Sequence, residues 1–522
     1  MFKELIKEKI SLDQKIGKQT TQVLIEGDLI VPDMKPDMSV ILQTSSQAII
    51  ERAELGADRV SFIGKLSVQI LYLARSSQNR VHSMNMSIAI DDFVNMEGVT
   101  KDTQVDVMCE IAHIDYRMIN DRKISYRAIV DVLISALNHE THEAVVDISD
   151  VPANQLLKNS VALTKSVEAR TEQFAVKDLL TIEPGKPNIR EILQTHMNIS
   201  NKECRISGGK MTISGDLILK ILYRGDNESS VIDIAEHEIA FTHSIESAVL
   251  RDDMFSDAVL TPLDQYVQIQ ADSDGESRVI SIEITVSAAI KVASSQNIEV
   301  LEDAYCINKV LNLHKVPVKY SKLISHNKTQ SPAKEIVALD DTCPDILQIF
   351  AAYGKSFVHE IKIVDDKVIV EGSIEANVLY IAESDDMPLY SYKAELPFKQ
   401  IIETKGATPD MEVSIRAAIE HVSFNMLSGR EMELRFLISF NTSVYKEKEM
   451  FVITDIEFED MEKAIIDNMP SMTIYVVQIG DDLWKIAKKY NTSIDELLAV
   501  NDIEKPNEVI AGHKLLVLKK VE

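Results

Sequence analysis

GKLSVQILY, from Gly64 to Tyr72, is the stretch of sequence that decides the fold, because the chain repeats its pattern three times. The other copies are GDLILKILY, which ends at Tyr223, and GSIEANVLY, which ends at Tyr380, so each copy reads G-x(6)-L-Y. Apolar and polar residues alternate through the first copy, as they do in a strand with one buried face. We therefore expect a strand whose buried face carries Phe62, Gly64, Leu66, Val68, Ile70 and Tyr72.

Two further landmarks precede each copy at constant distances. A proline stands 28 residues before the glycine, and a glutamine stands 14 residues before that proline. The copies lie 151 and 157 positions apart, which fits whole domains and exceeds the roughly 20–50 residues of a solenoid repeat. The sequence thus predicts three related domains, at residues 20–165, 166–325 and 326–458, after a segment 1–19 that we expect to be helical.

Most other segments of the three domains also alternate with period two, and many are separated by polar loops. Examples are QVDVMCEIAHIDYRMI from Gln104, RVISIEITVSAAI from Arg278 and MELRFLISFNTSV from Met432. This pattern predicts antiparallel strands in a sandwich or barrel. The predicted fold class is therefore mainly β, with three antiparallel β-rich repeat domains that contain short helices, followed by a small βααβ domain.

The short helices are expected at the three prolines, in the segments PDMSVIL, PNIREIL and PDILQIF. A proline suits the first turn of a helix, and Met38, Ile41 and Leu42 have the spacing of one helix face. We interpret the residue after each proline as a cap. A ligand role is disfavoured because one of the three is an uncharged amide; these residues are Asp37, Asn188 and Asp345.

The recurring glycine and tyrosine of the three copies are interpreted as structural. A glycine at a constant place in a strand usually marks a bulge or a close backbone approach, and a tyrosine at a strand end usually packs with its hydroxyl at the rim. With these features the triplicated unit resembles the SPOCS domain of coat-associated proteins of endospore-forming bacteria. The resemblance implies an architecture only, because no catalytic residues come with this family.

The C-terminal segment has a different pattern. Residues 459–472 form an expected linker, and residues 473–522 form an expected small domain. Its first strand is predicted at Ile474–Val477 and its closing strand at Lys514–Leu518. Two predicted helices lie between these strands, so the expected order is βααβ.

Capping signals place the two helices of this small domain. Asp481 is expected to cap a helix that runs from about Asp482 to Lys489. Ser493, with Glu496 three residues later, has the signature of a capping box and predicts the start of the second helix.

The small domain resembles LysM, the lysin motif. The family pattern Y-x-V-x-x-G-D-x-L-W-x-I-A is met from Tyr475 to Ala487, with Asp482 where the family usually has threonine. The resemblance implies a shallow groove for glycans that contain N-acetylglucosamine, between the first strand–helix loop and the second helix–strand loop. The groove residues implied in this chain are Gly480, Asp481, Asp482, Leu483, Asn501, Asp502, Ile503, Lys505 and Pro506.

We interpret this groove as a protein-docking site in preference to a glycan site. Asp482 adds a carboxylate where sugar groups would approach the backbone. The N-terminal residues lack the apolar stretch of a secretory signal, so we expect the protein to stay in the cytosol, away from the cell wall. Trp484, the only tryptophan, is interpreted as a packing residue and not as a sugar-stacking platform.

Composition and charge disfavour several classes of function. The chain has 522 residues and a formal net charge of −27, which is too acidic for a general binder of nucleic-acid phosphates. No apolar run reaches the roughly 18 residues of a membrane-spanning helix, so direct membrane insertion is not expected. The four cysteines are scattered and predict reduced thiols. We expect neither a metal nor a cofactor.

The candidate catalytic motifs are incomplete. GKS at Gly354–Ser356 lacks the first glycine of a phosphate loop, since that position holds Ile349. HETHE at 139–143 spaces its histidines by three where a zinc helix needs four, so we interpret it as a solvated loop. The sequence contains no GxSxG elbow. We predict no enzymatic activity.

Three SPOCS-like repeats followed by a LysM module resemble the SipL-type coat morphogenetic proteins of endospore formers. The resemblance implies a cytoplasmic adaptor of the mother cell, located at the forespore surface. Its implied partners are the spore coat morphogenetic ATPase, bound through the LysM module, and other forespore-surface assembly proteins. The alternative is a peptidoglycan-binding protein of the cortex or cell wall. A wall hydrolase would need a catalytic domain, which we do not find in the sequence.

Overall fold

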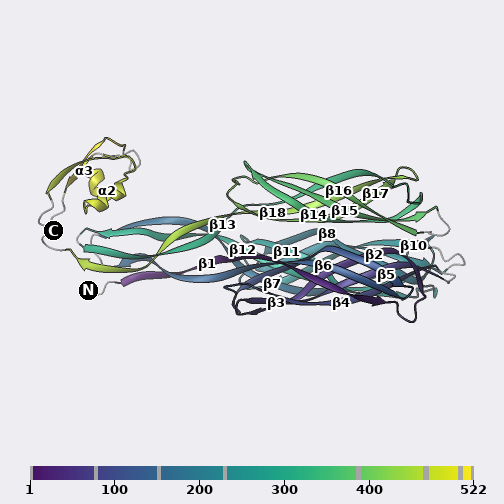
Figure 1. Ribbon diagram of the computed structural model, residues 1–522. Coiled ribbons are helices and arrows are strands. Elements are labelled where there is room, and N and C mark those ends of the chain that lie inside the picture. The colour runs from purple at the N-terminus through teal and green to yellow at the C-terminus, as the bar shows by residue number, and fades with distance from the viewer. Residues whose placement is uncertain are drawn as a thin grey trace.

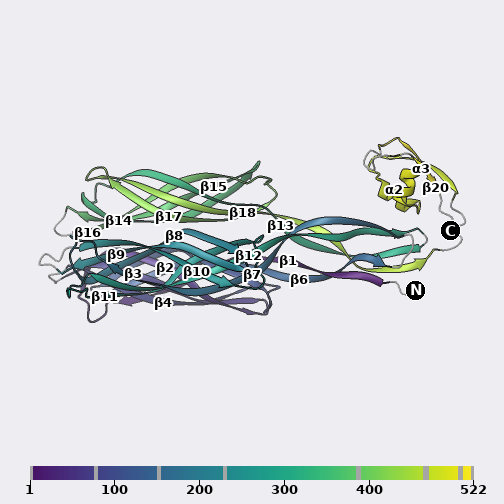
Figure 2. The same ribbon diagram turned by 180° about the vertical axis from the view of Figure 1, so that it is seen from behind.

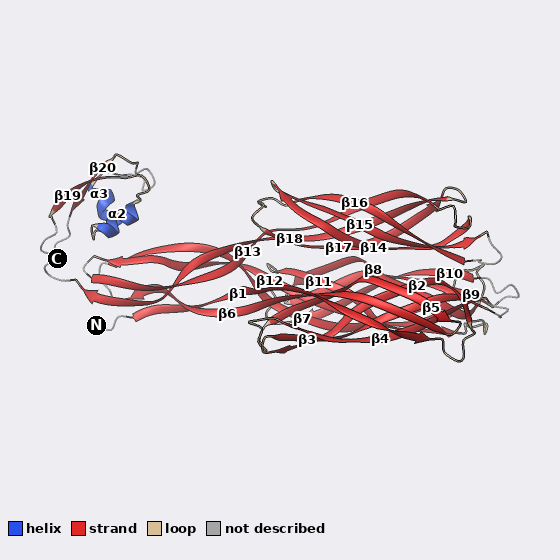
Figure 3. Ribbon diagram, in the orientation of Figure 1, coloured by secondary structure: helices blue, strands red, loops and turns tan. Residues whose placement is uncertain are grey.

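The computed structural model consists almost entirely of long antiparallel strands, with a small helical domain at its C-terminal end (Figures 1 and 3). It describes residues 4–75, 80–149, 154–226, 232–307, 309–383, 389–461, 470–501, 503 and 510–518.

Each of the three repeats contains six strands in the same order. The first has β1 (Glu4–Ile30), β2 (Met38–Gly56), β3 (Arg59–Ala74), β4 (Val81–Asn95), β5 (Gln104–Asn120) and β6 (Lys123–Ser149). The second has β7 (Asn154–Thr181), β8 (Ile189–Ser207), β9 (Lys210–Gly225), β10 (Ile232–Glu246), β11 (Phe255–Gln270) and β12 (Val279–Cys306). The third has β13 (Lys309–Ala338), β14 (Ile346–Val364), β15 (Lys367–Ala382), β16 (Leu389–Glu403), β17 (Glu412–Met426) and β18 (Glu431–Asp460).

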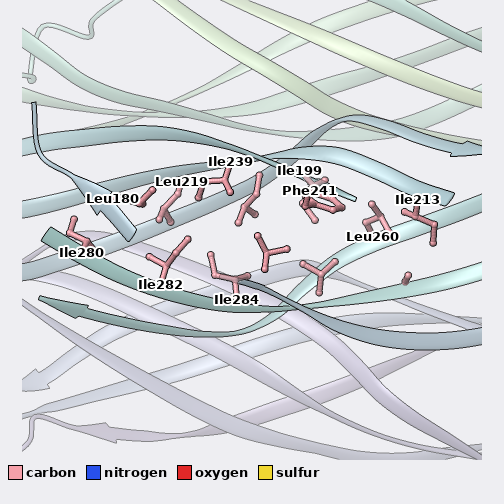
Figure 4. Packing of buried hydrophobic residues seen from close by; sticks show 14 of the residues in the cluster. Leu180, Ile199, Ile213, Leu219, Ile239, Phe241, Leu260, Ile280, Ile282 and Ile284 are labelled. Carbon is pink, nitrogen blue, oxygen red and sulfur yellow. The ribbon is translucent and has the colours of Figure 1, made fainter. Parts of the chain in front are cut away.

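The six strands of a repeat form two packed three-stranded sheets. In the second repeat the sheets have the orders β10-β9-β8 and β11-β12-β7, and the other repeats follow the same scheme. Figure 4 shows the core of this repeat, where Ile239 and Phe241 of one sheet lie above Ile282 and Ile284 of the other. The predicted antiparallel sandwich is thus confirmed. The domain limits expected at 165/166 and 325/326 fall inside β7 and β13.

The first and last strands of each repeat continue beyond the sandwiches and form a narrow stalk (Figures 1 and 2). The stalk is held together by apolar residues from all three repeats, among them Leu12, Leu163 and Val318. The chain passes from one repeat to the next at the far end of this stalk, where β6 precedes β7 and β12 precedes β13.

The leucine and the tyrosine of the L-Y dipeptide lie in different hydrophobic clusters in all three copies. Tyr72, Tyr223 and Tyr380 are fully buried inside their own repeats. The neighbouring leucines point to the opposite face of the same strands, where they meet in a single apolar cluster between the repeats; these are Leu71, Leu222 and Leu379. The repeat motif therefore stabilises each domain and also joins the three domains around a common centre.

The glycine of each copy permits a close approach to the neighbouring strand, as the sequence indicated. A Cβ atom on Gly64 would overlap the carbonyl oxygen of Ile49, and a Cβ on Gly215 would lie 3.1 Å from the carbonyl oxygen of Ser200. The neighbouring strand has a register shift beside this point, between Ile50 and Arg52 in the first repeat. These glycines thus lie opposite β-bulges.

The prediction of short helices after the three prolines is wrong. In PDMSVIL, PNIREIL and PDILQIF the first two residues belong to a loop, and the remaining residues begin the strands β2, β8 and β14. Two register shifts follow each other closely there, for example between Met38 and Val40 and between Ile41 and Gln43. A bulge adds one residue to one side of the ladder, so residues three apart return to the same face. Paired bulges therefore imitate the spacing of a helix.

The residue after each proline is not a helix cap. An arginine from the hairpin before the long last strand donates to it through Nη1, and the same guanidinium donates to carbonyl groups of the loop that contains the proline. The pairs are Arg122 with Asp37 at 2.7 Å, Arg278 with Asn188 at 2.9 Å, and Arg430 with Asp345 at 2.7 Å. A guanidinium donates to a carboxylate or to an amide oxygen, so both residue types can occupy this position.

The N-terminal segment is also a strand. Glu4–Ile30 form β1, which pairs with β6 along its whole length, and Ile10 and Leu12 of this strand are buried. The helical assignment of residues 1–19 is therefore wrong. The segment forms a strand because it pairs with β6, which lies more than a hundred residues later in the sequence. HETHE lies in β6 opposite β1, with His139 Nδ1 2.7 Å from Asp13, so its assignment as a solvated loop is also wrong.

The buried tyrosines supply a test of this architecture. Tyr223 donates its hydroxyl hydrogen to the carbonyl oxygen of Pro187 at 3.2 Å, and burial raises the pKa of this phenol to about 12. Tyr223→Phe is expected to lower the free energy of unfolding by about 1 kcal/mol, because the carbonyl group loses its partner. Denaturant titration checks this value. The exposed Tyr266→Phe is the control, and equal stability losses in both variants would contradict the assignment.

Candidate functional site

The C-terminal domain has the predicted βααβ order. It consists of β19 (Met472–Val476), α2 (Leu483–Lys489), α3 (Ile494–Val500) and β20 (Lys514–Leu518). The two strands pair antiparallel. Side chains from both helices and both strands form its core, among them Leu483, Ile486, Ala487, Leu497, Leu515 and Val517.

Both helices begin with a capping residue. Asp482 is the N-cap of α2 and accepts a hydrogen bond from the Lys485 backbone N–H at 2.7 Å, so the expectation that Asp481 caps this helix is wrong by one position. Ser493 and Glu496 form the predicted capping box of α3. The replacement of threonine by Asp482 is explained by the cap, since both residue types are suitable N-caps.

On the first side of the predicted groove, two residues have side chains that stabilise the fold of the domain itself. Asp481 accepts hydrogen bonds from the Tyr475 hydroxyl at 2.6 Å and from the Gln478 backbone N–H at 2.8 Å, which lower the pKa of its carboxyl group. Leu483 is buried in the core. Gly480 has a positive φ of 90°, and no atom lies within 4 Å of a Cβ built on it, so the loop backbone is open there.

On the second side of the groove, Asn501 also has a structural role. Its side-chain amide donates to the carbonyl groups of Leu497 and Leu516 and accepts from the Leu516 backbone N–H at 2.6 Å, which ties α3 to β20. Ile503 packs against the domain core. Asp502, Lys505 and Pro506 lie outside the residues that the structure describes.

The outward face of the two-stranded sheet is mostly apolar. The strands place Met472 opposite Leu518 and Ile474 opposite Leu516. Ile474 is 66% exposed, and Met472, Val476 and Leu518 are exposed as well. Lys514 lies opposite Val476 on the same side. We call the face formed by these residues the outer sheet face; it consists of Met472, Ile474, Val476, Lys514, Leu516 and Leu518. A contiguous exposed apolar surface of this kind is typical of an interaction site.

A different face of the C-terminal domain contacts the stalk, and α2 lies on the side of the domain that faces the stalk in Figure 1. The indole N–H of Trp484 donates to Asp303 at 2.8 Å, and Lys488 Nζ lies 2.7 Å from both oxygens of the same carboxylate. Tyr305 packs edge-on against Trp484, with ring centroids 4.9 Å apart, and donates its hydroxyl hydrogen to the Thr492 carbonyl at 2.7 Å. We call Asp303 and Tyr305 the seat, because the C-terminal domain rests on these two residues of the stalk.

The seat carboxylate is held in its charged form. Burial would raise the pKa of Asp303, but the hydrogen bonds from Lys488 and Trp484 and the charges of Lys488 and Lys315 outweigh it, so the pKa is lowered. Tyr305 is 5% exposed and belongs to the core of the LysM domain, although it lies on β12.

No group of three or more metal-ligating side chains occurs among the described residues. No helix among them is long and apolar enough to cross a bilayer. None of the four cysteines, all of which lie in the described ranges, forms a disulfide bond.

Comparison with known families defines the class of this protein. The model described as "SipL, SPOCS domain" matches residues 37–119, 188–269 and 345–427, and the model of the LysM domain matches residues 475–517. The searches of curated proteins and of solved structures gave no match. The molecule is therefore a protein of three tandem β-domains with a C-terminal domain of the peptidoglycan-binding type, and both domain types are non-catalytic.

The chain carries three SPOCS domains of the SipL family together with a LysM domain, which is the domain content expected of a SipL-type protein, and a role in sporulation and coat assembly follows from that family. Each SPOCS match begins at the residue that accepts from the repeated arginine. The predicted resemblance is thus confirmed over both parts of the chain.

Sequence reasoning missed the seat entirely. Asp303 lies 181 residues before Trp484, and no local pattern links the two. One signal was present in the repeats themselves. Tyr305 stands where the first and third repeats have Ser149 and Glu457, so a comparison of the repeats would have shown an aromatic residue peculiar to the second.

Proposed function

We propose that this protein is a non-catalytic adaptor of spore coat assembly that binds the coat morphogenetic ATPase through its LysM domain. In this proposal it acts in the mother cell at the forespore surface. The three SPOCS domains form the body that carries the LysM domain and offers surface to other assembly proteins. The three SPOCS domains support the process, and the LysM surface supports the type of ligand.

The observation that carries the proposal is the apolar outer sheet face. Glycan recognition depends on polar groups that hydrogen-bond to sugar hydroxyls, whereas five of the six side chains of this face are Met, Ile, Val and Leu, and only Lys514 carries a polar group. Such a face gains stability when it is covered by apolar side chains of another polypeptide. The face remains exposed in the folded chain, with Ile474 at 66%.

The predicted groove remains part of the proposal as the second contact region. Its structural residues, Asp481 and Asn501, have their side chains engaged within the domain. Gly480 and Asp482 leave an open loop and a partly exposed carboxylate beside α2. We propose that the partner contacts these two residues when it covers the domain.

Peptidoglycan binding is the second candidate function, since LysM is a domain of that type. The open backbone at Gly480 favours it, because a sugar ring can approach main-chain groups there. The two candidates differ in the surface they use. A peptide partner needs the outer sheet face, whereas a glycan needs the groove alone.

Ile474→Glu in the full chain is expected to weaken binding of the ATPase by about tenfold or more, because a central apolar contact is replaced by a charge that would lose its water. Titration calorimetry or interferometry with the purified ATPase measures this change. Leu179→Glu is the matched control, because Leu179 is 63% exposed but lies on β7. Equal affinities for the wild-type chain and Ile474→Glu would contradict the proposed face.

Deletion of residues 473–522 separates the two candidate functions. Loss of ATPase binding without a change in binding to insoluble peptidoglycan supports the adaptor. Loss of peptidoglycan binding alone, with the ATPase still bound, would support the alternative and overturn the proposal. Asp482→Lys tests the groove in the same assays and is expected to weaken whichever ligand uses it.

A further inference from the structure

The far end of the stalk carries three equivalent ion pairs. In each repeat an aspartate follows a bulge in the last strand, and a lysine of the next repeat lies beside it. The pairs are Asp147 with Lys158 at 2.9 Å, Asp303 with Lys315 at 3.8 Å, and Asp455 with Lys7 at 3.9 Å. The first repeat thus pairs with the second, the second with the third, and the third with the first. The three pairs therefore form a closed ring around the end of the stalk. The ring contains three similar carboxylates, and each could in principle accept a hydrogen bond from the LysM domain.

Among the described residues, only Asp303 has a neighbour two positions later that also contacts the LysM domain. Two residues after the aspartate the three repeats have Ser149, Tyr305 and Glu457. Tyr305 supplies an apolar ring to the LysM core and a hydroxyl to the Thr492 carbonyl. A serine is too short for this role, and a glutamate would bring a second negative charge. The sequence of the second repeat therefore selects where the LysM domain lies.

We propose that Asp303 and Tyr305 form an intramolecular latch, which holds the LysM domain on the stalk and covers its Trp484–Lys488 face. A ligand that requires this face binds only after the domain leaves the seat. A ligand that uses the outer sheet face binds while the latch is closed, because that face is exposed in the docked domain. The latch stands on the stalk contacts alone and does not rest on the proposed function.

The contacts are suited to a latch that opens and closes. On the stalk side they include the Asp303 carboxylate, the Tyr305 ring and Met461, whose Sδ lies 4.0 Å from Asn491 Nδ2. Asp303 keeps a partner in Lys315 when the domain leaves. Opening therefore leaves no isolated buried charge on the stalk, which would otherwise be costly. On the LysM side, Lys488 lies at the solvent-exposed edge of the contact.

The fluorescence of Trp484, the only tryptophan of the chain, reports the latch directly. In the full chain, Asp303→Ala with Tyr305→Ala is expected to shift the emission to longer wavelength and to increase quenching by acrylamide, because the indole loses both its carboxylate partner and its aromatic cover. Asp455→Ala with Glu457→Ala is the matched control at the equivalent positions of the third repeat and is expected to leave emission unchanged. Unchanged emission and quenching in the Asp303 and Tyr305 variant would overturn the latch.

Zero-length carbodiimide cross-linking tests whether the contact is made within one chain. The reagent joins carboxylates to amines that touch, so a link between Asp303 and Lys488 is expected, and the pair Asp147–Lys158 serves as the positive control. A mixture of isotope-labelled and unlabelled chains separates links within a chain from links between chains. A Lys488 link found only between chains, or absent while the control pair reacts, would overturn the intramolecular latch.

Discussion

Replacing Glu191 by valine is expected to lower the free energy of unfolding by about 3–5 kcal/mol, because it removes the partner of a buried charge. Arg224 is only 3% exposed and lies between the first and second repeats. Its Nη1 donates to Glu191 at 2.7 Å, and its Nη2 donates to the carbonyl oxygen of Val81 in the first repeat. Chemical denaturation of the full chain, followed by circular dichroism, measures the loss.

The electrostatics of the pair support this expectation. Burial would raise the pKa of Glu191, but the hydrogen bond from Lys35 and the charges of Lys35 and Arg224 outweigh it and lower the pKa. Burial lowers the pKa of Arg224 in spite of Glu191. Both groups are therefore charged at neutral pH, and removing Glu191 leaves the Arg224 charge without its carboxylate partner.

The other repeats provide the rescue variant. At the positions of Glu191 and Arg224 the first repeat has Val40 and Leu73, which face each other in its ladder. Glu191→Val combined with Arg224→Leu is expected to recover most of the loss, since an apolar pair can replace a buried ion pair at little cost. A double variant as unstable as Glu191→Val alone would show that shape, and not charge, determines stability at this interface.

Gly372→Ala is expected to lower the free energy of unfolding by about 3 kcal/mol, at the upper end of the cost of overpacking a core. A Cβ atom at this position would overlap the carbonyl oxygen of Phe357 and lie 2.6 Å from Phe398 Cζ. The carbonyl group belongs to the paired backbone of β14, so it cannot move without disturbing the ladder. Denaturant titration measures the effect.

Gly17→Ala is the control for this substitution. Gly17 also lies in a strand, but the nearest atom to its added Cβ is Met96 Cε at 3.6 Å, an ordinary contact. Its stability is expected to stay within about 0.5 kcal/mol of the wild-type chain, as for an unstrained site. If both glycine variants lose the same stability, backbone entropy and not close approach explains the role of Gly372.

The strands and the LysM domain were accessible from the sequence because their signals are local. Alternation in GKLSVQILY reports one buried face, and Phe62, Leu66 and Val68 are indeed buried. The βααβ domain was equally accessible, since capping residues and a dense family pattern lie within a few residues of one another.

The bulges at the prolines were not accessible in this way. Met38 and Ile41 repeat at a spacing that a helix and a doubly bulged strand share, and only the ladder with β3 separates the two. The N-terminal strand is a similar case, because its partner β6 lies more than a hundred residues away. The alternation of apolar and polar residues within a segment shows which face is buried, but it does not show which other strand the segment pairs with.

By itself, the sequence determined that the chain carries three β-domains and a LysM domain, since repeats, period-two alternation and capping motifs are properties of neighbouring residues. Only the tertiary structure decided that the L-Y leucines join the three repeats, that Arg122 and its equivalents hold the proline loops, and that Asp303 and Tyr305 hold the LysM domain. The physical reason is that each of these contacts joins side chains from distant strands. Which of many chemically similar residues meet depends on how the sheets pack in space.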